Sequence, residues 1–135
     1  MTFKRFEEII AWQLADQLRK QVIAASDRGS FAKDYKFCAQ IRDAANSGSS
    51  NIAEGFKRFN PREFAQFVKY SRSSLAEMKN HLYDAKDRGH IDEIQYATMT
   101  KLAARAAIAA ARLHAYLRTA QPPRAEKRPR TRKKS

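Results

Sequence analysis

Residues 47–55 read SGSSNIAEG and hold three serines, two glycines and one asparagine within nine positions. The flanking sequence is rich in Ala, Glu, Lys and Arg, which favour α-helix. Steps of 4, 3, 4, 3 and 4 positions from Ile41 pass through the stretch by way of Ala45, Gly48, Ile52, Gly55 and Phe59. Because packed helices repeat apolar or small residues at this heptad spacing, we predict that residues 47–55 are helical.

Two glycines inside a helix call for a compensating interaction, since each costs about 1 kcal/mol relative to alanine. Small side chains let another helix approach closely, so we predict a contact surface, within one chain or between copies. Ser47, Asn51, Glu54 and Arg58 form a second, polar row. A phosphate-binding loop is disfavoured because its Gly-Lys-Ser/Thr ending is missing. The predicted helix or subunit contacts are Gly48, Asn51, Ile52, Glu54, Gly55 and Glu77.

Periodicity on both sides of this stretch predicts four helices. The first covers about residues 6–28 and stops at Gly29, and the second covers about residues 34–59. The cap signal Asn60-Pro61 opens the third, which ends at Gly89, and Asp92 with Gln95 opens the fourth, which lasts to about residue 120. Short connections favour antiparallel neighbours. We therefore predict an all-α, antiparallel up-down four-helix bundle over residues 1–120.

Residues 121–135 read QPPRAEKRPRTRKKS, and their prolines and charges predict a disordered basic tail. The whole chain carries a net charge of +13, of which the tail, with seven bases and one acid, supplies +6. The remaining 120 residues therefore keep +7. This excess favours nucleic acid or another polyanion as a partner. Solubility, or contact between the tail and an acidic protein, is the alternative.

Basic residues recur on the third and fourth predicted helices and gather at the junction of the second and third. Spacings of 3, 7 and 7 give a stripe on the third helix, and spacings of 4 and 7 give one on the fourth. Binding through such residues is salt-dependent and weakly sequence-specific, because it uses phosphates. A merely solvated face is the alternative. The predicted nucleic-acid contacts are Lys57, Arg58, Arg62, Lys69, Arg72, Lys79, Lys86, Lys101, Arg105 and Arg112.

The sequence contains no recognisable catalytic or metal-binding constellation. His81, His90 and His114 lack the spacing that brings two imidazoles to one metal. The single cysteine, Cys38, excludes an internal disulfide and disfavours a cysteine-based zinc site. The chain also lacks an apolar run long enough to span a membrane and the hydrophobic segment of a signal peptide. We expect a cytoplasmic protein that is not an enzyme and uses no metal or cofactor.

Three segments carry a family resemblance: FEEIIAWQLADQL, QIRDAANSGSSNIAEGFKR and EFAQFVKYSRSSLAEMKNHLYDAKDRGHI. Together they resemble the bacterial four-helix-bundle proteins encoded in intervening sequences of 23S ribosomal RNA genes. The most specific element is NIAEG at residues 51–55, followed by Arg58, Phe64 and Phe67, and the resemblance covers about residues 3–118. It implies an antiparallel bundle that forms ring-like homopentamers. The accessory proteins of diversity-generating retroelements, which partner a reverse transcriptase and bind nucleic acid, are more distantly related.

These observations predict a non-enzymatic homo-oligomer, a pentamer by the resemblance, that binds RNA or DNA with low sequence specificity through its basic faces and tail. It would act as an accessory to a partner enzyme. The small residues of the second helix and the Ala-rich fourth helix, whose apolar arc is broad, are the expected contacts between copies. The alternative is a purely structural homo-oligomeric scaffold that contacts proteins and has no nucleic-acid role.

Overall fold

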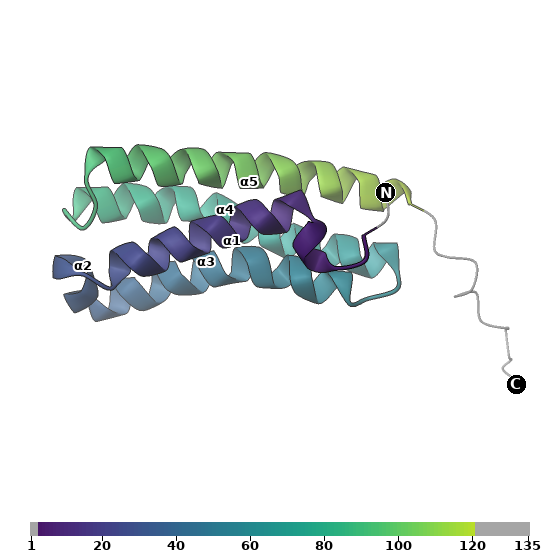
Figure 1. The fold of residues 1–135 in the computed structure, drawn as a ribbon, viewed down its shortest axis with the longest axis horizontal. Coiled ribbons are helices and arrows are strands. Elements are labelled where there is room, and N and C mark those ends of the chain that lie inside the picture. The colour runs from purple at the N-terminus through teal and green to yellow at the C-terminus, as the bar shows by residue number, and fades with distance from the viewer. Residues whose placement is uncertain (1–2, 121–135) are drawn as a thin grey trace, which may run out of the picture.

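The computed structural model describes residues 3–120, and this part of the chain is helical with no strand. A short 3-10 helix, η1 (Phe6–Glu8), precedes five α-helices: α1 (Ile10–Ser26), α2 (Gly29–Lys33), α3 (Tyr35–Phe56), α4 (Pro61–Asp87) and α5 (Glu93–Thr119). The four long helices α1, α3, α4 and α5 lie side by side as a helical bundle (Figure 1). The α3–α4 turn and the end of α5 share one end of the bundle, which we call the tail end, and α2 lies at the other.

The first predicted helix is interrupted at Ile9, which is a correction to the expected continuous helix. Ile9 has an extended backbone with φ of −81° and ψ of 121°, and its side chain is buried in the core. Gln13 fixes the break, because its Nε2 donates to the Glu7 carbonyl oxygen at 2.8 Å. Gly29 does not directly end this helix either: α1 stops at Ser26, and Gly29, with φ of +58°, begins α2.

Residues 47–55 lie inside α3, as predicted. All described members of the heptad row up to Gly55 are buried, namely Ile41, Ala45, Gly48, Ile52 and Gly55. Phe59 is the exception: α3 ends at Phe56, and the Phe59 side chain is 81% exposed. The chain turns there because the Lys57 and Arg58 amides donate to carbonyls only three residues back, at 3.2 and 3.0 Å. The row therefore ends at Gly55.

Both predicted helix starts are confirmed by their capping hydrogen bonds. The Asn60 side chain accepts from the Arg62 amide at 2.8 Å, with Pro61 as the first residue of α4. Asp92 accepts from the Gln95 amide at 2.7 Å, and the Gln95 side chain accepts from the Asp92 amide at 2.9 Å. This reciprocal pair is a capping box, which satisfies amides that the first helical turn leaves without partners.

α5 packs against both α4 and α1, which explains the broad apolar arc predicted from its sequence. Its buried side chains are Met99, Leu102, Ala103, Ala106, Ala110, Leu113 and Leu117. Ala109 and Tyr116 lie at the edge of this arc, where Tyr116 is 39% exposed. α4 and α1 of the same chain therefore cover most of the apolar surface of α5. Within residues 3–120, no helix combines the length and hydropathy needed to cross a lipid bilayer.

Candidate nucleic-acid interface

The glycines of α3 lie where this helix packs against α4. A Cβ added at Gly55 would meet the Phe64 ring at 2.7 Å and the Phe67 Cβ at 2.8 Å. A Cβ added at Gly48 would lie 3.2 Å from the Leu75 side chain. The missing side chains therefore allow α4 to approach α3 closely. This contact is within the chain, so the buried glycine faces are not offered to a second copy.

The polar row beside the glycines joins the same two helices. Ser71 donates to the Gly48 carbonyl oxygen, and Ser74 donates to the Ser47 hydroxyl at 2.8 Å. Asn51 Nδ2 donates to the Ser47 hydroxyl at 2.8 Å and to the Ser47 carbonyl at 2.9 Å. Asn51 thus orients the serine that receives the hydrogen bond from α4. Its observed contacts are structural and lie within the chain.

The two acidic residues predicted at this contact have different neighbours. Glu54 pairs with Arg58 at 3.2 Å and with Lys57 at 3.9 Å, and all three side chains are substantially exposed. Glu77 lies further along α4, where its carboxylate is 3.7 Å from His81 Nε2. Glu54 therefore offsets part of the positive charge at the α3–α4 turn, whereas Glu77 takes no part in that turn.

Nine of the ten predicted nucleic-acid contacts are exposed, and the exception is Lys86. Its Nζ lies over the Tyr96 ring, 4.3 Å from the centroid, and 3.7 Å from a Glu93 carboxylate oxygen. With Lys57 and Arg58, it is one of three predicted contacts that have an acidic partner. No Asp or Glu within residues 3–120 forms an ion pair with the other seven, which are Arg62, Lys69, Arg72, Lys79, Lys101, Arg105 and Arg112.

Basic side chains of α4 and α5 converge near the tail end. Arg72 Nη1 lies 3.2 Å from His114 Nδ1. The pKa of His114 is lowered from its ordinary value, first by burial and then by repulsion from the positive charges of Arg72, Arg118 and Lys69. Arg118 also lines a hollow of about 360 Å³ together with Arg62. We call Arg62, Lys69, Arg72, His114 and Arg118 the α4–α5 basic cluster.

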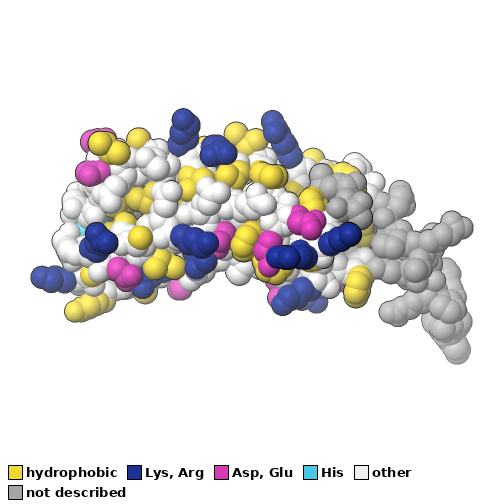
Figure 2. Space-filling view, viewed as in Figure 1, with side chains coloured by type: hydrophobic (Ala, Val, Ile, Leu, Met, Phe, Trp, Pro, Cys, Tyr) yellow, Lys and Arg dark blue, Asp and Glu magenta, His cyan; other side chains and the backbone are white. Residues whose placement is uncertain are grey.

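The basic stripe predicted on α5 lies on a different side of that helix. Arg112 lines a hollow of about 250 Å³ between α5 and the start of α1, which includes Phe3 and Ile10. His114 and Arg118 instead face α4. In Figure 2 the Lys and Arg side chains along α5, at the upper edge, stand apart from acidic side chains over most of the helix. Residues 94–120 contain no Asp or Glu, which explains this separation.

Sequence reasoning missed His114 and Arg118 as members of the cluster. His114 was considered only as a metal ligand, for which its spacing is wrong, and Arg118 falls outside the 4 and 7 spacing that selected Arg112. The available signal was the absence of acidic residues between Glu93 and the end of α5, because it leaves every base in that part of the helix without a neighbouring carboxylate in the helix. The pairing of these residues with Arg72 and Arg62 depends on how α5 is rotated against α4.

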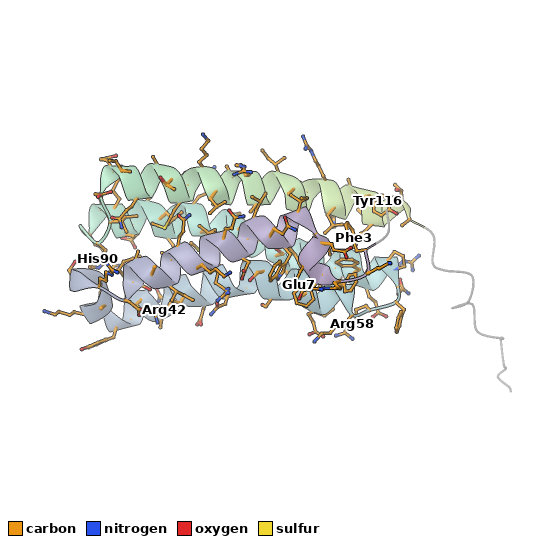
Figure 3. The ribbon with its side chains drawn as sticks, in the orientation of Figure 1. Phe3, Glu7, Arg42, Arg58, His90 and Tyr116 are labelled. Carbon is orange, nitrogen blue, oxygen red and sulfur yellow. The ribbon has the colours of Figure 1, made fainter. Side chains whose placement is uncertain are left out.

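At the other end of the bundle, basic and acidic side chains form ion pairs with each other. The Asp34 carboxylate accepts from His90 Nε2 and from Arg88 Nη1, each at 2.8 Å, and Arg88 also bonds Asp84. The hydrogen bonds from His90 and Arg88 lower the pKa of Asp34 below its ordinary value. Figure 3 shows His90 at this end and Arg58 and Tyr116 at the tail end. No group of three or more His, Cys, Asp or Glu residues within the described range is arranged to hold a metal.

We predict that His114 makes folding pH-dependent. Because its pKa in the folded chain is below 6.5, the folded state binds fewer protons than the unfolded state near that pH. Its contribution to the free energy of unfolding is therefore complete above about pH 6.5 and lost as the pH falls through the lowered pKa. An NMR titration of the imidazole should report a pKa below 6.5, and Arg72→Gln should raise it. A wild-type pKa at or above 6.5 would contradict the excess of positive charge around His114.

Comparison with protein-family models shows which family this chain belongs to. The model of the family described as 23S rRNA-intervening sequence protein matches residues 7–109, well over half of the chain. The chain belongs to this family. The match includes Arg62, Lys69 and Arg72 of the basic cluster and ends before His114 and Arg118. The family description gives no biochemical activity, and comparison with curated proteins gives no match.

Proposed function

We propose that this family member is a non-enzymatic, oligomeric bundle protein that binds RNA or DNA through phosphates, with the α4–α5 basic cluster as a principal contact. One observation carries the proposal: five basic side chains from two helices converge without an acidic ion-pair partner in the described chain. The rest of α5 adds further cations in a segment that lacks acidic residues. The tail, which lies outside the described residues, brings seven more bases.

The electrostatics of the cluster favour an anionic ligand. Repulsion from three neighbouring cations already disfavours a proton on His114. A bound phosphate would offset this repulsion and raise the pKa of His114, so nucleic-acid binding should strengthen as the pH falls. Contacts of this kind are made to the backbone rather than to base edges, so low sequence specificity follows.

We propose that the chain assembles as a homopentamer in the cytoplasm and that the bundle has an antiparallel up-down topology. The short segments 57–60 and 88–92 support the topology, and the resemblance to ring-forming relatives supports the pentamer. Because the glycines pack within the chain, the proposed contact between copies lies on the α1–α5 face. There Ile10 and Ile108 are each more than half exposed, and an apolar hollow includes Phe3 and Ala109.

The test is the salt dependence of binding, measured by fluorescence anisotropy with labelled duplex DNA and mixed-sequence RNA. Each phosphate contact on duplex DNA contributes about −0.9 to the slope of log affinity against log salt concentration. Four cations of the cluster should therefore weaken duplex binding about fiftyfold between roughly 50 and 150 mM salt. Absence of binding to both nucleic acids at low salt would reject the proposal and leave the protein-contacting scaffold as the better account.

A further inference from the structure

The turn between α3 and α4 presents an aromatic ring to solvent. At 81% exposure, Phe59 is the most exposed large apolar side chain among residues 3–120. Its neighbour Arg58 covers a different ring, with the guanidinium carbon 4.8 Å from the Phe67 centroid. Phe59 itself makes no ring or cation contact within the described range. Most of its surface is therefore open to a planar ligand.

Asn60, the residue after Phe59, lines a hollow that also contains two arginines. Asn60, Pro61 and Arg62 line one side of this space of about 360 Å³, and Leu117 and Arg118 line the other. Neither guanidinium forms an ion pair with an acidic residue of the described chain. Each guanidinium presents several N–H donors in a planar fork that matches the oxygens of a phosphate. The hollow thus combines two positive charges with donors suited to a phosphodiester.

The ring and the hollow lie within reach of one nucleic-acid strand. Phe59 precedes Arg62 by three residues, so their Cα atoms are at most about 11 Å apart. Successive nucleotides of a stacked strand rise about 3.4 Å, so roughly three nucleotides cover this distance. Bases in a duplex stack on each other and pair, whereas an unpaired base can leave its neighbours and stack on an aromatic side chain.

We propose that the tail end of the bundle is a binding site for single-stranded nucleic acid, in which Arg62 and Arg118 hold a phosphate and Phe59 stacks on a nearby base. This inference rests on the proposed function and adds a preference for single strands over duplex. It assigns Phe59 a role that the phosphate contacts alone do not require. Stacking uses the face of a base, which RNA and DNA share, so the site accepts either.

The test compares Phe59→Ala with Tyr35→Ala, a matched control whose ring is 79% exposed at the opposite end of the bundle. Anisotropy is measured with 12-nucleotide RNA, 12-nucleotide DNA and a 12-base-pair DNA duplex. Phe59→Ala should weaken binding of both single strands about fivefold or more, the effect of removing one stacking partner. Duplex affinity should change less than twofold, and Tyr35→Ala should change none of the three.

A 12-nucleotide abasic strand separates stacking from phosphate binding. Wild type and Phe59→Ala should bind it equally, whereas Arg62→Gln and Arg118→Gln should weaken binding of both the abasic and the natural strands. If Phe59→Ala binds single strands like wild type while the arginine variants bind them weakly, stacking is overturned and the proposed function stands. If wild type binds the duplex but neither single strand, the single-strand site is overturned and the proposed function stands; if it binds neither the single strands nor the duplex at low salt, both proposals fall. A changed sedimentation mass of free Phe59→Ala would assign the ring to a contact between copies and overturn the site.

Discussion

Gly55→Val is expected to lower the free energy of unfolding by about 3 kcal/mol or more, the upper range for overpacking a core. The first added carbon would already lie 2.7 Å from the Phe64 ring and 2.8 Å from Phe67 Cβ. Phe64 is buried, so its ring has little freedom to swing away, and the Phe67 atom is fixed close to the backbone of α4. The two helices would have to separate. Urea unfolding followed by circular dichroism measures the loss.

Gly48→Ala is the matched control in the same helix. Its added Cβ would lie 3.2 Å from Leu75 Cδ2, a contact that a shift of a few tenths of an ångström relieves, and alanine favours helix by about 1 kcal/mol over glycine. These effects oppose each other, so stability should stay within about 1 kcal/mol of wild type. If Gly55→Val were as stable as wild type and changed only the sedimentation mass, the glycine contact would lie between copies instead of within the chain.

The double variant Lys69→Glu/Arg72→Glu is expected to weaken nucleic-acid binding by several hundredfold at about 50 mM salt. Each substitution removes one phosphate contact and adds a like-charge repulsion, which is more costly than neutralisation. Both side chains are exposed and neither has an acidic partner in the described chain, so the fold should be retained. Anisotropy with duplex DNA measures the loss, and circular dichroism verifies the helices.

Lys33→Glu/Lys36→Glu makes the same change in net charge at the α2 end of the bundle. These lysines are also exposed and lack an acidic ion-pair partner among residues 3–120. Their reversal should weaken binding less than tenfold, because only the long-range attraction, which salt screens, is reduced. Equal losses in the two double variants would show that binding follows total charge and would remove the special role of the α4–α5 basic cluster.

Structural features that involve only residues close together in the sequence, such as helix caps and helical periodicity, could be predicted from it. The capping signals at Asn60-Pro61 and at Asp92 with Gln95 involve atoms within three residues, so local chemistry determines where α4 and α5 begin. The heptad row through residues 47–55 likewise follows from helical periodicity, and the helix is present despite its glycines and serines. The family was recognisable from the same stretch and is supported by the match over residues 7–109.

The tertiary structure decided which side of each helix meets which neighbour. Periodicity placed Lys86 in the same stripe as Arg72, yet Lys86 is covered by Tyr96 and paired with Glu93 from α5. Arg72 instead meets His114, 42 positions away. Such pairings depend on the rotation and register of α5 against α4, which the packing of the whole core fixes. The sequence alone therefore determined the four long helices and the excess of positive charge, and only the fold determined where that charge remains uncompensated.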